Sequence, residues 1–194
     1  WESLGDRAIR FPRPPAAAGA IVRAARAWPG VTDVVIARDD VAVYFDGAPV
    51  VDRERIRALV TAVEEPQSVR DLELAAIYDG PDLEDIARAA KLTVDEVVTL
   101  HASATYVVET MGFLPGFAYL SGLDPRLALP RLSTPRPNVH AGSIGIAGVH
   151  TAVYPFESPG GWHLLGRVTG VHMFGPQGAL LRLGDRVRFV RSVQ

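Results

Sequence analysis

The residues best suited to chemistry lie in one short segment, Tyr154–Trp162, with the sequence Tyr-Pro-Phe-Glu-Ser-Pro-Gly-Gly-Trp. Its polar centre is Glu157, the only carboxylate between Asp124 and Asp185. A single carboxylate held among prolines, glycines and aromatic rings is a candidate general base or substrate anchor. The alternative is structural: the carboxylate accepts hydrogen bonds from backbone amides in a tight loop. The sequence leaves both roles open, and we predict Glu157 as a catalytic residue.

The neighbours of Glu157 suit a surface that meets a ligand or a partner. Ser158 does not lie in a nucleophile elbow, so the sequence does not call for a serine hydrolase triad. Gly160 and Gly161 let the backbone approach another molecule without a Cβ in the way. Trp162 anchors the loop, because so large an aromatic ring is seldom fully exposed. We therefore predict that these four residues bind substrate or partner.

Histidine is the other residue type that invites a chemical role. None of the histidines forms the H-x-H or H-E-x-x-H pattern of a metal site, and carboxylates are scarce near them, so we predict no metal. His150 is predicted as a catalytic residue beside Glu157, whose charge it and His163 would tune if they lie nearby. The five histidines are His101, His140, His150, His163 and His172.

Two arginines, Arg131 and Arg136, flank a Leu-Ser-Thr-Pro sequence. Arginine binds a carboxylate or phosphate through two parallel hydrogen bonds, so both residues are candidates for substrate or partner binding. Arginine also commonly fixes loops by donating to backbone carbonyls. The sequence does not decide between these roles.

All these candidates fall in the segment Gly112–Gly170, which holds 10 of the 18 glycines and 7 of the 15 prolines but only six charged residues. Its many aromatic side chains distinguish it from a polar linker. We expect a long, ordered, irregular segment with an apolar surface that another molecule covers. Within it, Phe113, Pro115, Gly116 and Phe117 are predicted to bind substrate or partner, and Pro115-Gly116 predicts a type II turn.

The glycine repeat Gly142, Gly145 and Gly148 is not a dinucleotide fingerprint, and no Gly-Lys-Ser/Thr sequence occurs anywhere. If the chain handles ATP, it does so without a P-loop. The structural explanation of the repeat is tight turns or close backbone approach in a barrel.

Composition excludes several classes of protein. There is no cysteine, so disulfides and thiolate sites are absent. A formal net charge of -2 leaves no excess of positive charge to attract nucleic acid or an anionic membrane. No apolar run is long enough for a transmembrane helix and no signal peptide opens the sequence, so we expect a cytoplasmic protein.

Hydrophobic periodicity predicts an α+β fold with two domains. In residues 1–68, strands near 8–11, 31–37 and 41–45 and helices near 16–28 and 52–63 follow the order β-α-β-β-α. Together with a strand near 72–78, this order predicts a split βαβ, ferredoxin-like unit. Residues 64–68, Glu-Glu-Pro-Gln-Ser, are the best candidate linker.

Residues 69–194 predict a helical hairpin followed by a β-barrel or sandwich. The hairpin covers residues 82–104, and Thr93 and Glu96 have the spacing of a capping box. It imitates a helix-turn-helix, but its second helix carries acidic residues and no arginine, which argues against DNA binding. Short strands are expected at 106–111, 151–154, 164–168, 180–183 and 186–190.

Four segments carry distinctive motifs: Met111–Arg126, Thr134–Arg136, Ala141–Gly148 and Tyr154–Trp162. These motifs resemble the KipI / allophanate hydrolase subunit 1 family, which includes the B subunit of 5-oxoprolinase and part of the carboxyltransferase region of urea carboxylase. Shorter stretches at 4–7, 80–84 and 100–101 also fit. The chain departs from the usual family pattern at His140, where proline is common, and at His150 and His163, where glutamine is common.

The resemblance implies a small N-terminal α/β domain and a cyclophilin-like β-barrel domain. It also implies a heteromer with a KipA-like subunit 2, which is the C-type subunit, and a LamB/YcsF-type subunit. Such a complex uses ATP to hydrolyse a small amide, as a 5-oxoprolinase or an allophanate hydrolase, and the chain alone is expected to be inactive. The alternative is a regulatory protein that inhibits a sensor histidine kinase; a prolyl isomerase follows from fold analogy only.

Overall fold

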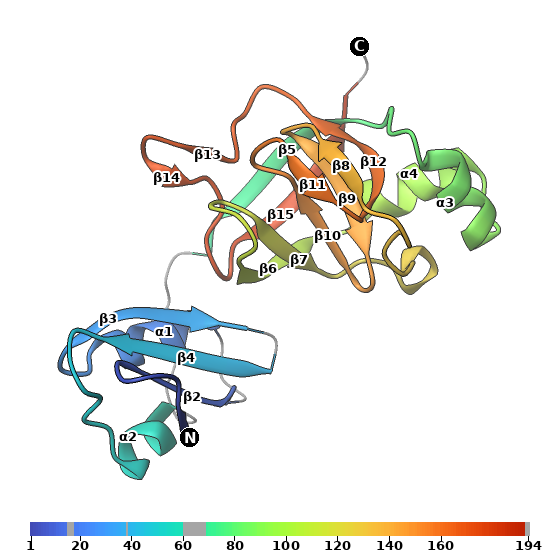
Figure 1. The fold of residues 1–194 in the computed structure, drawn as a ribbon. Helices are drawn as coiled ribbons and strands as arrows, with labels where there is room; N and C mark the ends of the chain where they lie inside the picture. The colour runs from blue at the N-terminus through green and yellow to red at the C-terminus, as the bar shows by residue number, and fades with distance from the viewer. Residues whose placement is uncertain (15–17, 38, 60–68, 193–194) are drawn as a thin grey trace. The chain divides into compact units, whose positions relative to one another are not determined.

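The computed structural model describes residues 1–14, 18–37, 39–59 and 69–192 (Figure 1). Contacts divide the chain into two compact units, Trp1–Ser68 and Val69–Gln194. Both units contain helices and strands, so the α+β class is confirmed. The expected linker at 64–68 lies outside the described residues.

The first unit is an antiparallel sheet of order β1-β2-β4-β3 with helix α1 (Ala18–Arg26) between β2 and β3 in the chain. Strand β4 lies between β2 and β3, which is the split β-α-β arrangement. Helix α2 (Arg53–Ala58) begins at Asp52, whose side chain accepts the Arg55 N–H at 2.8 Å, as the sequence predicts. The strands are β1 (Glu2–Ser3), β2 (Ala8–Pro12), β3 (Val31–Ile36) and β4 (Asp40–Phe45).

The strand expected near residues 72–78 forms, but it does not complete the first unit, so that part of the prediction is wrong. Strand β5 (Asp71–Ile77) pairs in parallel with β15 (Arg186–Arg191) and antiparallel with β12 (His163–Val168). In the first unit, β1 occupies the place beside β2. Alternation of apolar side chains predicts a strand but not its partner.

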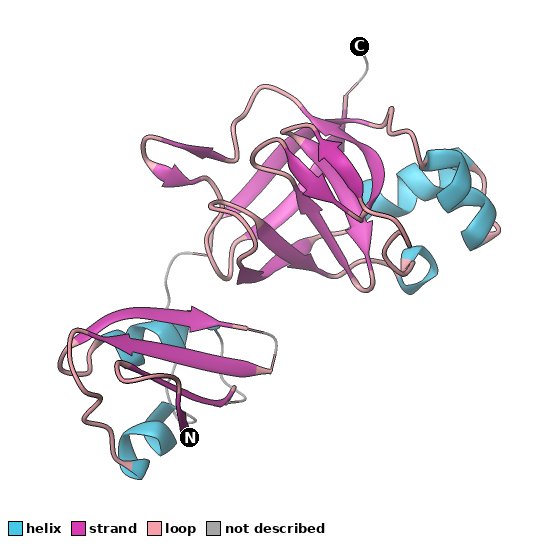
Figure 2. Cartoon of the chain, viewed as in Figure 1, coloured by secondary structure: helices cyan, strands magenta, loops and turns pink. Residues whose placement is uncertain are grey.

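The second unit is a closed barrel of seven strands in the order β10-β7-β6-β15-β5-β12-β9. Figure 2 distinguishes its strands, in magenta, from its helices, in cyan. Helices α3 (Leu83–Ala90) and α4 (Val94–Ser103) form the expected hairpin, and both hydrogen bonds of the Thr93–Glu96 capping box are present. No helix in the described residues is long and apolar enough to cross a membrane. The remaining barrel strands are β6 (Tyr106–Met111), β7 (Ala118–Ser121), β9 (Ser143–Ala147) and β10 (His150–Val153).

Two further expectations are corrected. The segment 112–170 is not irregular: it contains strands β7 to β12, including β8 (Arg136–Val139) and β11 (Ser158–Gly160), which pair with each other outside the barrel. Residues 180–183 form no strand. Instead a small hairpin of β13 (Phe174–Gly175) and β14 (Gly178–Ala179) precedes them, and Gly184 turns the chain into β15.

The alternation of side chains along the barrel strands creates two buried clusters. Ala118 and Leu120 of β7 belong to the main core, whereas Tyr119 between them packs on a second cluster. In β9, Ile144 and Ile146 point to the main core and Ala147 to the second cluster. The second cluster also contains Phe117, Val139, Ala152, Tyr154, Trp162 and Leu164. This aromatic cluster forms the floor of the candidate site.

Candidate functional site

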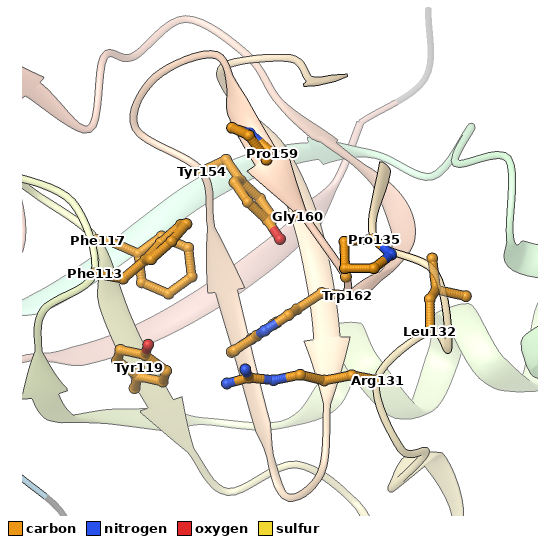
Figure 3. A pocket seen from close by; sticks show the side chains of 11 residues that line it. Phe113, Phe117, Tyr119, Arg131, Leu132, Pro135, Tyr154, Pro159, Gly160 and Trp162 are labelled. Carbon is orange, nitrogen blue, oxygen red and sulfur yellow. The ribbon is translucent and has the colours of Figure 1, made fainter. Parts of the chain in front are cut away.

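A pocket of about 270 Å³ opens over the aromatic cluster (Figure 3). Its walls come from β7 and the turn before it, from the Tyr154–Trp162 segment, and from the loop that precedes β8. The lining residues are Phe113, Phe117, Tyr119, Arg131, Leu132, Pro135, Tyr154, Pro159, Gly160, Gly161 and Trp162. A volume of this size suits a ligand smaller than a typical drug-sized molecule.

Phe117 is the centre of the aromatic wall and is almost fully buried. Its ring lies edge to face against Tyr119, Tyr154 and Trp162, with centroids 5.0, 5.4 and 5.6 Å away. Such pairs stabilise beyond their buried area by roughly 0.5–1.5 kcal/mol each. Phe113 continues the wall, 5.3 Å from Phe117, but 60 % of it is exposed. The wall is therefore rigid at its base and open at Phe113.

The turn that delivers Phe117 is the predicted type II turn. The Phe117 N–H donates to the Leu114 carbonyl at 3.0 Å, with Pro115 second in the turn and Gly116 third. Gly116 has a φ of 81°, which the third position of this turn requires. A Cβ there would also come within 2.9 Å of the Phe174 Cβ. Pro115 and Gly116 thus shape the wall without lining the pocket.

Gly160 leaves room for the hydroxyl of Tyr154. A Cβ on Gly160 would lie 2.3 Å from the Tyr154 hydroxyl oxygen, which is closer than Cβ atoms in proteins approach other heavy atoms. The Tyr154 ring is 1 % exposed, and burial raises the pKa of its phenol above the usual value. The positive charge of Arg131 and a hydrogen bond with the Trp162 backbone oppose this shift. At neutral pH the pocket therefore contains a protonated phenol.

Arg131 is held over the pocket by the backbone on both sides of it. The His163 Nε2–H donates to the Pro130 carbonyl at 3.0 Å, and the Leu132 N–H donates to the Gly161 carbonyl at 2.7 Å. The other ring nitrogen of His163, Nδ1, is buried without a partner in the described structure. In Figure 3 the Arg131 side chain extends from this loop into the pocket, beside Trp162.

Arg136 lies behind the pocket wall. Its guanidinium donates to Asp82 at 2.5 Å and to the Trp162 carbonyl at 3.3 Å, and Asp82 also accepts the Leu164 N–H at 2.6 Å. Asp82 is buried, so this ion pair links the start of α3 to β8 and β12. The geometry matches the structural alternative for Arg136, a side chain that fixes a loop through a carbonyl.

Glu157 lies outside the pocket, with 62 % of its side chain exposed. It accepts a hydrogen bond from Asn138 at 2.8 Å and lies 3.4 Å from the His140 Nδ1. Asn138 and His140 line a second, more polar pocket of about 400 Å³ that also includes Arg136. The neighbouring Ser158 has a buried hydroxyl with no hydrogen-bond partner in the described structure.

His150 is close to the aromatic pocket rather than to Glu157. Its Nε2 lies 2.7 Å from Glu109, and its ring stands edge to face against Tyr119 with centroids 5.9 Å apart. The histidine that contacts Glu157 is His140. The two residues predicted as catalytic are thus not joined by any contact, and both assignments stay predictions.

His101 belongs to a buried polar network beneath the site. The Thr151 hydroxyl donates to the Gly145 carbonyl at 3.1 Å, so it accepts from the His101 Nε2–H at 2.9 Å. The Nδ1 atom then accepts from the Tyr78 hydroxyl at 2.8 Å. Complete burial lowers the pKa of His101 to about 3, so the ring is neutral. The network connects α4 to β9 and β10 of the barrel.

The sequence of this chain matches a family model described as "Carboxyltransferase domain, subdomain C and D" over residues 13–180. The chain belongs to this family. It is 38 % identical over 220 residues to the B subunit of 5-oxoprolinase from Bacillus subtilis, covering 98 % of this chain and 91 % of that protein. It is 42 % identical over 173 residues to the protein of the same name in Escherichia coli O157:H7, covering 84 % and 76 %. The predicted resemblance is confirmed.

A solved structure of the family gives the same fold. The crystal structure of TTHA0988 superimposes with a TM-score of 0.79 at 36 % identity, covering 97 % of this chain. This chain spans 40 % of TTHA0988, so that protein contains a further region. The barrel and small sheet described here are therefore shared by a longer relative.

In this carboxyltransferase C and D subdomain, the pocket gathers many of the residues predicted for binding: Phe113, Phe117, Arg131, Gly160, Gly161 and Trp162. Pro115, Gly116, Arg136 and Ser158 do not line it. Five further lining residues are not among those predicted to bind, although two of them belong to the predicted Tyr154–Trp162 segment: Tyr119, Leu132, Pro135, Tyr154 and Pro159. Tyr119 could have been found from its spacing, since it follows Phe117 by two residues at the start of β7 and packs in the same cluster. In the described residues, no three His, Asp or Glu side chains group as a metal site.

Proposed function

We propose that this chain is the B-type subunit of a heteromeric, ATP-dependent amide hydrolase of the 5-oxoprolinase type. The observation that carries the proposal is 38 % identity to a protein named as the B subunit of 5-oxoprolinase, across nearly the full length of both chains. In this role the chain acts on a lactam C–N bond together with a KipA-like subunit 2 and a LamB/YcsF-type subunit. ATP is consumed by the complex, and the location is the cytoplasm.

Exposed aromatic side chains support an association with another subunit. Phe113 is 60 % exposed and Phe156 is 39 % exposed, and the Phe156 ring lies 5.6 Å from that of Phe174. Interface cores are enriched in aromatic residues and depleted in charge. The segment that carries Phe113 and Phe156 has this composition.

Reconstitution tests the proposal. The chain is co-expressed with a subunit-2-type protein and a LamB/YcsF-type protein from the same genome, and complex formation is followed by size-exclusion chromatography. We expect ATP hydrolysis that requires 5-oxoproline and all subunits, and no activity from this chain alone. Allophanate serves as the competing substrate. Separate elution at micromolar concentration, together with inhibition of a sensor histidine kinase, would instead identify the regulatory alternative.

A further inference from the structure

Arg131 is distinguished from the arginines around it by the absence of an acidic partner. Arg126, Arg136 and Arg167 form ion pairs with Asp124, Asp82 and Asp79. Throughout the described ranges, no carboxylate lies within ion-pair distance of Arg131. Because it also lines the pocket, its charge is available to whatever enters. The pocket is therefore electropositive although the chain as a whole has a formal net charge of -2.

The backbone that carries this charge is held in place before any ligand arrives. The hydrogen bonds from His163 to Pro130 and from Leu132 to Gly161 hold the backbone on each side of Arg131. Another hydrogen bond, from the Gly148 N–H to the Leu129 carbonyl at 2.7 Å, fixes the start of the same loop. A charge on an ordered loop loses less entropy when it binds than one on a free loop.

The aromatic walls of the pocket indicate what the uncharged part of the ligand is like. Aromatic rings alone would suit a cation, but the unpaired guanidinium repels one. Aromatic walls with one unpaired positive charge instead fit an anion that has a flat, partly apolar body. The Tyr154 and Tyr119 side chains add hydroxyl groups for a polar atom on that body. A nucleoside triphosphate does not fit this description, because about 270 Å³ and one cation match neither its size nor its charge.

We propose that this pocket binds a small cyclic carboxylate, with its carboxylate on Arg131 and its planar face against Trp162 and Phe117. The inference rests on the proposed function, where this ligand is the lactam substrate and the chain is the subunit that holds it. The nucleotide then binds elsewhere in the complex. Trp162 reports on binding, because Trp1 and Trp28 are the other tryptophans and both precede residue 69.

The test uses the indole N–H signal of Trp162 in the NMR spectrum of the full chain, alone and in the reconstituted complex, assigned with Trp162→Phe. The probes are 5-oxoproline, 2-pyrrolidinone, which is the same lactam without the carboxylate, and benzoate as an unrelated flat carboxylate. We expect saturable shifts with 5-oxoproline and benzoate, and at least tenfold weaker binding of 2-pyrrolidinone. Arg131→Gln should weaken carboxylate binding by roughly 10- to 100-fold, since it removes a charge-assisted contact.

Arg126→Gln is the matched control, because Arg126 is exposed, lies nearby in sequence and is paired with Asp124. It should leave binding unchanged. The inference is overturned if neither carboxylate shifts Trp162 in the chain or the complex, or if Arg131→Gln binds them as well as the wild type. An active complex in which 5-oxoproline leaves Trp162 unmoved would refute this site but not the function. Binding of 5-oxoproline by a complex that never hydrolyses it would refute the function but not the site.

Discussion

The Tyr154 hydroxyl oxygen packs directly against the Cα of Gly160, where any other residue would carry its Cβ. A methyl group there would lie 2.3 Å from that oxygen, so Gly160→Ala must push the Tyr154 ring out of place. We expect a loss of roughly 1–3 kcal/mol in the free energy of unfolding, as for other overpacked sites. Denaturant unfolding followed by Trp162 fluorescence measures it. Gly161→Ala is the control, since its Cβ would meet nothing closer than the Pro135 Cγ at 3.7 Å.

Glu157 remains the residue whose role most needs a direct measurement. Its exposed carboxylate, with Asn138 and His140 beside it, borders a polar pocket separate from the aromatic one. If Glu157 transfers a proton, Glu157→Gln should lower kcat of the complex by about 100-fold or more. Glutamine keeps the size of the side chain and an oxygen for Asn138. An unchanged kcat in this variant, with an unfolded Glu157→Ala, would show that Glu157 only braces the loop.

At the scale of elements, the loop 129–132 depends on β12 for its position. His163 uses only its Nε2–H, as the donor to the Pro130 carbonyl. Glutamine offers an amide N–H of similar reach, so His163→Gln should change carboxylate binding by less than about threefold. His163→Ala removes the donor and should weaken binding about fivefold or more through the freed loop. The Trp162 signal measures both, and equal binding by the alanine variant would contradict this role.

Local features of this fold could be predicted from the sequence, whereas pairings between distant segments could not. The Asp52 cap, the Thr93–Glu96 capping box and the Pro115-Gly116 turn are encoded within a few residues, and the structure has all three. The parallel partner of β5, strand β15, is more than a hundred residues away, and alternation carries no information about it. Residues 180–183 have the apolar character of a strand but form none in the structure.

The same distinction applies to the site. Trp162 and Phe117 could be predicted as binding residues because they lie in motifs unusually rich in glycine, proline and aromatic residues. The Arg131 loop and Tyr119 come together with them only through the closure of the barrel. Arg131 and Arg136 are equivalent in sequence, and only the position of Asp82 beside one of them separates a structural arginine from one that faces the pocket.

At the scale of the whole molecule, the buried His101 makes stability depend on pH. Burial lowers its pKa from 6.5 to about 3, so between these values the unfolded chain binds a proton that the folded chain does not. The contribution of neutral His101 to the free energy of unfolding is fully present above pH 6.5 and is lost as the pH falls toward 3. We expect His101 to increase the slope of the unfolding free energy against pH by at most about 1.4 kcal/mol per pH unit.

Unfolding of the second unit at pH 4 to 7, followed by Trp162 in a Trp1→Phe, Trp28→Phe background, measures this slope. His101→Gln should be less stable at neutral pH but should show a shallower dependence on pH. The exposed His172 gives the control, because His172→Gln should keep the wild-type slope. Parallel curves for wild type and His101→Gln would mean that His101 does not control acid sensitivity.

The parallel pairing of β5 with β15 has a consequence for the order of folding. Strand β15 lies between β5 and β6 in the barrel. The first two barrel strands in the chain are therefore bridged by the last barrel strand to be synthesised. A nascent chain lacking residues 186–191 can form the helical hairpin, but it must leave the edges of β5 and β6 unpaired. Closure is therefore a late, long-range event with a large loop entropy cost. During synthesis, these open edges can pair with other chains, so the unclosed barrel is the stage most prone to aggregation.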